Sequence, residues 1–182
     1  MKKNIVNIFF LFVVFMMLSA SSFAAKPSAD KKGKGIELVA SEWRSRCGKD
    51  EKTGKESKDK CEVYQRISVK KTKARIAEMA LGFPIDEKGK KSKSARGVVI
   101  LPLGILLENG IVMKIDDEKP AVFKVRFCTN SGCVAYVNLD KKLLTSMKKG
   151  KNINFIFKSS VGQDVNIVMS LKGFTWALTK LD

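Results

Sequence analysis

The four cysteines of the chain, at positions 47, 61, 128 and 133, are the residues whose spacing most restricts their chemistry. Cysteines bind metals, exchange electrons, attack substrates or form disulfides. A structural zinc site usually takes its cysteines in pairs that are two to four residues apart, whereas thirteen residues separate Cys47 from Cys61. Four residues separate Cys128 from Cys133, so the redox motif C-x-x-C is absent. The spacing therefore favours disulfides over metal binding or redox chemistry.

Other catalytic groups are missing or isolated. The chain has no histidine, which removes the commonest general base, the imidazole metal ligand and every Ser-His or Cys-His pair. Neighbouring carboxylates occur at 116–118 and 86–87, but both groups lie in predicted turns rather than across a cleft. Neither a Ser-Lys motif set nor a phosphate-binding glycine loop is present. The sequence therefore predicts no catalytic residue, no metal and no cofactor, and a hydrolase with an unrecognised site is an unsupported alternative.

The N-terminus has the pattern of a secretory signal peptide. Lys2 and Lys3 precede an apolar run at 5–18, and Ser22 and Ala24 fit the small residues before a cleavage site. A membrane span needs about 20 apolar residues, which is more than this run provides. We therefore predict a signal peptide at 1–24, export to the periplasm, the outer membrane or the medium, and no transmembrane segment in the mature chain.

Export places the cysteines in an oxidising compartment, where an even number of cysteines predicts disulfides. Four cysteines allow three pairings, and the sequence alone does not choose among them. We favour Cys47–Cys61 and Cys128–Cys133, because each pair flanks a polar loop rich in turn-forming residues. Between Cys128 and Cys133 the turn sequence TNSG offers Gly132 for a positive φ, so a bridge there would fix the register of a hairpin.

Positive charge is the unusual property of the composition. Loss of Lys2 and Lys3 with the signal peptide leaves 33 basic and 18 acidic residues, a formal charge of +15. Such a charge attracts anionic glycans, lipids, proteins or nucleic acid, of which nucleic acid is not expected outside the cytoplasm. The alternative is that the charge only keeps an exported protein soluble. The best-supported basic patch consists of Lys88, Lys90, Lys91, Lys93 and Arg96.

The elements that must position these residues are mainly strands. After a flexible leader at 25–35, we expect a single domain at 36–182, which is long enough for a hydrophobic core. About ten short apolar or alternating segments, separated by turn residues, predict an all-β fold, a β-sandwich of short antiparallel strands. One of these expected strands is 174–181. Hairpin turns are predicted at Asn109-Gly110 and in the stretch that ends at Pro120.

One short helix is expected at about 140–149. Asp140 is a favourable N-cap, and Leu139 and Leu144 form a hydrophobic staple. Lysines occupy the last turn, where the helix dipole favours cations, and Gly150 is the expected terminating residue.

The order of several motifs resembles the invasion-associated locus B family of exported proteins from Gram-negative bacteria. The motifs are Trp43 followed by Cys47 and Cys61, the LPLG turn at 101–104, the stretch at 110–116, the F-C…G-C-V-A segment at 127–135 and the leucine-containing helix at 143–150. The resemblance covers 36–181. It implies an exported, disulfide-bonded β-sandwich without known catalytic residues, and in some members a link to the entry of bacteria into erythrocytes.

We therefore expect a non-enzymatic accessory protein that promotes association with host cells, in particular erythrocytes. Its basic loop would contact anionic glycans, lipids or proteins of the cell surface, which is rich in sialic acid. The alternative is a periplasmic ligand-binding or chaperone-like module that uses an apolar groove between the sheets and has no role in invasion. A fold does not by itself decide between such functions, and the sequence predicts no oligomeric state.

Overall fold

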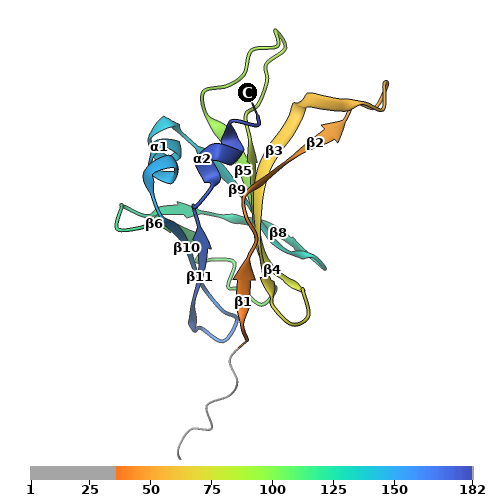
Figure 1. Ribbon diagram of the computed structural model, residues 1–182. Helices are drawn as coiled ribbons and strands as arrows, with labels where there is room; N and C mark the ends of the chain where they lie inside the picture. The colour runs from red at the N-terminus through yellow and green to blue at the C-terminus, as the bar shows by residue number, and fades with distance from the viewer. Residues whose placement is uncertain (1–35, 182) are drawn as a thin grey trace, which may run out of the picture. The chain divides into compact units, whose positions relative to one another are not determined.

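The computed structural model of the chain describes residues 36–181. The predicted signal peptide at 1–24 and leader at 25–35 lie outside the described residues. Within the described part, the chain forms two antiparallel β-sheets and two short helices (Figure 1). The all-β prediction with antiparallel strands is confirmed, although the structure has a second helix that the sequence did not predict.

The larger sheet has seven strands in the order β1-β3-β4-β5-β9-β8, and β2 pairs with β3. β1 and β2 pair in succession with one edge of the long strand β3, and the β2–β3 hairpin extends beyond β4 (Figure 1). The strands of this sheet are β1 (Leu38–Ala40), β2 (Arg44–Lys49), β3 (Glu56–Val69), β4 (Arg75–Gly82), β5 (Ala95–Leu101), β8 (Val125–Thr129) and β9 (Gly132–Leu139).

The smaller sheet packs against the inner face of the larger sheet. It consists of β6 (Ile111–Ile115), β7 (Ala121–Phe123), β10 (Asn152–Lys158) and β11 (Asp164–Ser170), in the order β11-β10-β6-β7. Met79 and Leu81 of the larger sheet and Met113, Phe155 and Met169 of the smaller sheet are all buried in one core. Side chains alternate between the two faces of a strand, so each sheet contributes every second residue to this core.

Helix α1 (Lys141–Lys149) begins as predicted. The side chain of Asp140 accepts a hydrogen bond of 2.8 Å from the backbone N–H of Leu143. Gly150 follows the helix, but its φ of −73° is open to any residue. Glycine is needed there because the backbone at position 150 lies close to the side chain of Ile115, and a Cβ at this position would lie 2.6 Å from its Cγ2.

The predicted strand at 174–181 is wrong, because the structure has helix α2 (Phe174–Leu178) there. Gly173, at φ +84°, turns the chain before the helix. A strand would bury alternate residues, whereas Trp176 is 62% exposed and the buried positions are Phe174, Ala177 and Leu178. This i, i+3, i+4 spacing is that of one helix face.

The hairpin predicted at Asn109-Gly110 is also wrong. The turn exists, since the N–H of Gly110 donates to the carbonyl of Leu107 at 3.2 Å. The segment before it does not form a strand, and only Ile105 makes an isolated bridge, to Ser159. The turn that ends at Pro120 does join two paired strands, β6 and β7.

Candidate functional site

Both disulfides that the sequence favoured are present. Cys47 lies opposite Cys61 on the β2–β3 hairpin, and Cys128 lies opposite Cys133 on the β8–β9 hairpin. The Cα–Cα distances are 3.9 Å and 4.0 Å. All four cysteines of the chain are therefore oxidised, and none offers a thiol as nucleophile or metal ligand. Two disulfides are typical of proteins that reside outside the cytoplasm.

The structure brings most of the predicted basic patch together around the loop between β4 and β5. Lys88, Lys90 and Lys93 are exposed on this loop, and Arg96 is exposed on β5. Lys91 is only half-exposed, because its ammonium group donates a hydrogen bond to the carbonyl of Leu181. Four of the five predicted residues thus face solvent, and the fifth holds the C-terminal segment against the loop.

An open depression of about 740 Å³ lies beside this loop. Lys90, Lys91, Lys93 and Arg96 line it together with Asn138 of β9. The loop is ordered locally, because the carboxylate of Asp86 accepts hydrogen bonds from the backbone N–H groups of the lysines at 88 and 90.

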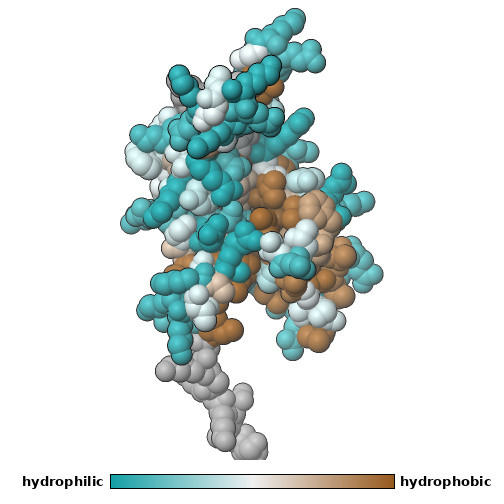
Figure 2. Space-filling view, turned by 90° about the vertical axis from the view of Figure 1, so that its right-hand side faces the viewer, coloured by the Kyte–Doolittle hydropathy of each residue, from teal (hydrophilic) through white to brown (hydrophobic). Residues whose placement is uncertain are grey.

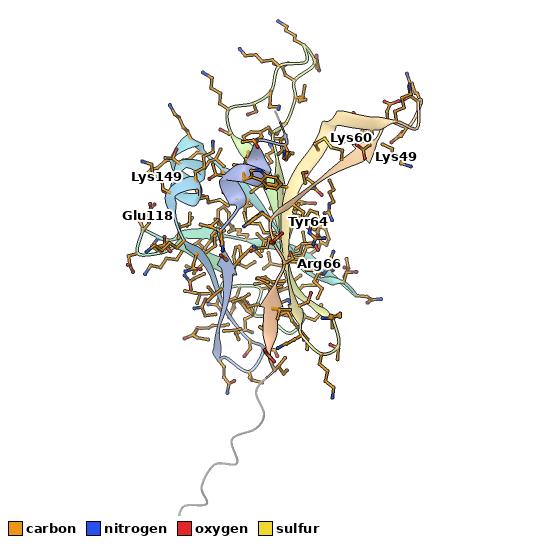
Figure 3. All side chains as sticks on the ribbon, in the orientation of Figure 1. Lys49, Lys60, Tyr64, Arg66, Glu118 and Lys149 are labelled. Atoms are coloured by element: carbon orange, nitrogen blue, oxygen red, sulfur yellow. A yellow bond between two sulfur atoms is a disulfide. The ribbon has the colours of Figure 1, made fainter. Side chains whose placement is uncertain are left out.

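The outer face of the larger sheet carries a second basic feature, which sequence reasoning missed. All six arginines of the chain lie on this face, at positions 44, 46, 66, 75, 96 and 126, and so do both tyrosines, at 64 and 136. We call this surface the arginine face. Figure 2 views the molecule from the side away from the smaller sheet and shows an apolar area that adjoins hydrophilic surface. Figure 3 shows Tyr64 and Arg66 on β3.

A buried carboxylate organises one half of the arginine face. Glu78 is 3% exposed and lies opposite Arg66 in the β3–β4 register. Its Oε2 accepts a hydrogen bond of 2.8 Å from Nε of Arg66, and Oε1 lies 3.3 Å from Nη2 of Arg46. Nη1 of Arg75 is 3.5 Å from Oε2. Burial raises the pKa of Glu78, but the hydrogen bond from Arg66 and the charges of the three arginines outweigh it, so the pKa is lowered overall.

The arginines around Glu78 are themselves held in place. Nε of Arg46 is 2.6 Å from the carboxylate of Glu62, and its guanidinium lies over the ring of Tyr64, 4.4 Å from the centroid. Arg75 donates a hydrogen bond of 2.7 Å to the carbonyl of Ser131, in the β8–β9 turn. The cluster therefore ties β2, β3, β4 and the β8–β9 turn together.

The other half of the arginine face is an open groove of about 630 Å³. Arg96, Lys124, Arg126 and Tyr136 line it, and each of these side chains is exposed. The ring of Tyr136, which is 52% exposed, packs edge-on against Phe127 at a centroid distance of 6.4 Å. Arg96 and Asn138 line both this groove and the depression beside the lysine loop, so the two hollows adjoin.

A smaller pocket of about 470 Å³ lies where the link between β1 and β2, together with β3 and β11, meets helix α2. Trp43, Gln65 and Trp176 line it, and the indole N–H of Trp43 donates to the carbonyl of Ser170 at 2.8 Å. Gln65 is 1% exposed, and its Oε1 has no hydrogen-bond partner within the described residues. This is a buried acceptor that a ligand with a hydroxyl or amine could satisfy.

Apart from positions 58 and 59, whose side chains the structure does not describe, residues 36–181 contain no group of three or more acidic, histidine or cysteine side chains suited to a metal ion. No helix within these residues has the length and apolar character that a membrane crossing requires.

The comparisons with known proteins agree with the fold. The sequence model of the Invasion associated locus B (IalB) protein family matches residues 43–182. Invasion protein B of Bartonella bacilliformis is 26% identical over 193 residues, covering 98% of this chain and 97% of that protein. An invasion protein B homolog of Brucella abortus (strain 2308) is 37% identical over 86 residues, which is 47% of this chain and 50% of the homolog. That match thus spans about half the length of the Brucella protein.

A solved structure shows the same fold. The crystal structure of invasion associated protein B from Bartonella henselae superposes with a TM-score of 0.63 and 20% sequence identity, covering 79% of this chain and 94% of that one. Because the family match extends over more than half of the sequence, with its start at the buried Trp43, the chain belongs to the Invasion associated locus B family.

Proposed function

We propose that this protein is an exported, non-enzymatic accessory protein that promotes association with host cells, including erythrocytes, through its basic surface. The names of its relatives, which are called invasion proteins, support this role. The observation that carries the proposal is the exposed cationic loop. Lys88, Lys90 and Lys93 face solvent there, and within the described residues none of them forms a salt bridge with a carboxylate.

Contacts of this kind are individually weak. An exposed ion pair contributes about 0.2–1 kcal/mol, and at physiological ionic strength charges are screened over about 8 Å. Useful affinity therefore requires many contacts with a densely anionic surface, such as the glycans, lipids or proteins of a host cell. An outer-membrane or secreted location of the mature protein would give the loop access to that surface.

Adhesion to erythrocytes at several salt concentrations tests this proposal. We expect binding of the purified exported protein to fall steeply between 0.05 and 0.5 M NaCl, values chosen so that the screening length shrinks from over 10 Å to under 5 Å. Charge reversal of Lys88, Lys90, Lys93 and Arg96 to Glu should abolish most of the binding. Reversal of four exposed lysines of α1, at 141, 142, 148 and 149, is the matched control with the same change in net charge.

The control shows whether binding depends on the position of the charges or only on the net charge of the protein. The α1 variant should retain more binding than the variant with reversed charges at Lys88, Lys90, Lys93 and Arg96. Adhesion that survives high salt and the loop reversal would show that the basic surface does not mediate association with cells.

A second candidate function is the binding of a small ligand in the periplasm, for which the unsatisfied Oε1 of Gln65 is the supporting observation. The indole of Trp176 would cover one side of such a ligand. Labelling of intact cells distinguishes the two candidates, because a protein that is wholly protected from a surface-labelling reagent fits the periplasmic role alone.

A further inference from the structure

The placement of the arginines differs from that of the lysines. The chain has 29 lysines, which are spread along the sequence from Lys2 to Lys180, whereas all six arginines lie on the arginine face with both tyrosines. Arginine and tyrosine are among the residue types most enriched in the energetically important centres of binding interfaces. A guanidinium also recognises a carboxylate through two parallel hydrogen bonds, which the lysine ammonium cannot do. The face thus has the composition of a recognition surface.

Five of the six arginines on this face divide into two groups, and the sixth, Arg44, is exposed and lines neither hollow. Arg46, Arg66 and Arg75 are bound to Glu78 and form the structural cluster described above. Arg96 and Arg126 form no salt bridge within the described residues and line the open groove. The cluster fixes the strands, and the guanidiniums of Arg96 and Arg126 are then presented on a rigid sheet. A site on strands is held more precisely than a site on a mobile loop.

The shape of the hollow suits a chain rather than a small molecule. The groove adjoins the depression beside the lysine loop through the shared residues Arg96 and Asn138. Together the two hollows extend from Lys124 and Arg126 near β8 to Lys90 and Lys93 in the β4–β5 loop. Cations occur along this whole path, so an extended polyanion would meet positive charge at both ends and in the middle.

We infer that this path binds a linear acidic polysaccharide whose charges are carboxylates. The inference rests on the proposed function, because it specifies the anionic partner and its binding site. Arg96 and Arg126 would each donate two parallel hydrogen bonds to a carboxylate of the ligand. The exposed ring of Tyr136 would lie against the apolar side of a sugar ring.

Two polar residues in the groove favour a sugar chain over other polyanions. Asn138 both donates and accepts hydrogen bonds, which matches sugar hydroxyls and N-acetyl groups. The carboxylate of Glu62 accepts hydrogen bonds from hydroxyls but repels a second anion. A ligand with hydroxyls and a moderate spacing of carboxylates therefore fits the groove better than a densely sulfated chain or an acidic polypeptide.

Affinity for hyaluronate, which carries a carboxylate on every second sugar, tests this site. The groove variant combines Arg96→Gln, Lys124→Gln and Arg126→Gln. The loop variant combines Lys88→Gln, Lys90→Gln and Lys93→Gln, with the same loss of charge. We expect the groove variant to bind hyaluronate about tenfold more weakly, and the loop variant no more than about threefold more weakly. Neutral dextran and poly-glutamate are the comparison ligands, and both should bind more weakly than hyaluronate.

A variant that keeps the net charge and the fold excludes the possibility that weaker binding comes from lost charge or from unfolding. Tyr136→Ala removes an exposed ring, so the sheet should remain intact, as its urea midpoint would show. This variant should lower the affinity for hyaluronate severalfold and leave the weak binding of poly-glutamate unchanged.

Several results would overturn the inference. Equal losses in the groove and loop variants would mean that binding follows total charge. Poly-glutamate that binds as tightly as hyaluronate would exclude the sugar, as would undetectable hyaluronate binding. In each of these cases erythrocyte adhesion decides the proposed function separately: if adhesion still falls with salt and with reversal of the loop charges, the proposed function stands while the groove inference fails.

Discussion

Glu78 and Arg66 face each other across β3 and β4, and two nitrogens of the guanidinium contact one oxygen of the carboxylate. Oε2 of Glu78 lies 2.8 Å from Nε and 2.7 Å from Nη2 of Arg66. The carboxylate is buried while the guanidinium is partly exposed, so the pair is anchored in the sheet and open to solvent on the arginine side.

Replacement of Glu78 by Gln should destabilise the protein at neutral pH. The amide keeps the shape of the side chain but leaves Arg46, Arg66 and Arg75 close together without their shared anion. Hydrogen bonds to charged groups contribute about 1.5–3 kcal/mol, and the partial exposure of the arginines lowers this value. We expect a loss of about 1–2 kcal/mol in the free energy of unfolding, measured with urea. An unchanged free energy would show that the cluster is only a set of solvated charges.

The same substitution should change the pH dependence of stability. Because folding lowers the pKa of Glu78 below its ordinary value of 4.5, the carboxylate contributes stability that is fully present above about pH 4.5. This contribution is lost as the pH falls through the lowered pKa. The difference in stability between the native protein and Glu78→Gln should therefore be constant from pH 6 to 8 and shrink below pH 4.5. A difference that grows toward acid pH would contradict the assignment.

The two disulfides should differ in their contribution to stability. Cys47 and Cys61 are 14 residues apart in sequence, and Cys128 and Cys133 are 5 residues apart. The loop-entropy relation gives about 3 kcal/mol for the longer loop and about 2 kcal/mol for the shorter one. We expect the Cys47→Ala, Cys61→Ala pair to lose more stability in urea than the Cys128→Ala, Cys133→Ala pair. The reverse order would mean that packing of the buried Cys133 outweighs loop closure.

The start of α1 offers a test of the N-cap. Asp140→Ala removes the acceptor for the N–H of Leu143 and should cost about 1 kcal/mol. Asp140→Asn is the matched control, because asparagine caps a helix as well as aspartate does. If both variants lose the same amount, the charge of Asp140 rather than its hydrogen bond stabilises the helix.

Replacement of Gly150 by alanine could raise or lower the stability of the protein, and the direction of the change tests the close contact described above. At its φ of −73°, alanine would ordinarily stabilise the protein by about 0.4–1 kcal/mol, because it restricts the unfolded chain. The Cβ would, however, approach Cγ2 of Ile115 to 2.6 Å and the carbonyl oxygen of Ser146 to 3.0 Å. Overpacking of this kind costs about 1–3 kcal/mol, so we expect Gly150→Ala to unfold at a lower urea concentration. A more stable variant would rule out the close contact.

The elements that sequence analysis predicted correctly have local signals. The alternation along 61–69 specifies a strand because one face is buried, and Asp140 specifies a helix start through a contact three residues away. Helix α2 lacked such a signal. It has five residues, too few for a helical repeat to show, and its position depends on packing of Phe174 against Trp43 at a centroid distance of 4.8 Å, which joins distant parts of the sequence.

The arginine face was not predictable for the same reason. Arg46, Glu62 and Glu78 come together only through the pairing of β2, β3 and β4, and no spacing within one segment indicates it. The charge run in the β4–β5 loop was visible because its lysines are neighbours in sequence. The contact of Lys91 with Leu181 joins positions 90 residues apart and could not be inferred from the run itself.

Both disulfides close hairpins of the larger sheet, and neither crosses to β6, β7, β10 or β11. The disulfides therefore reinforce the larger sheet alone. The disulfides cross-link two hairpins of the larger sheet, while the smaller sheet is held against it, beyond the chain connections, by core packing and hydrogen bonds such as that from Trp43 to Ser170. We therefore expect the smaller sheet to separate first under mechanical load or mild denaturation, while the bridged hairpins of the larger sheet stay paired the longest.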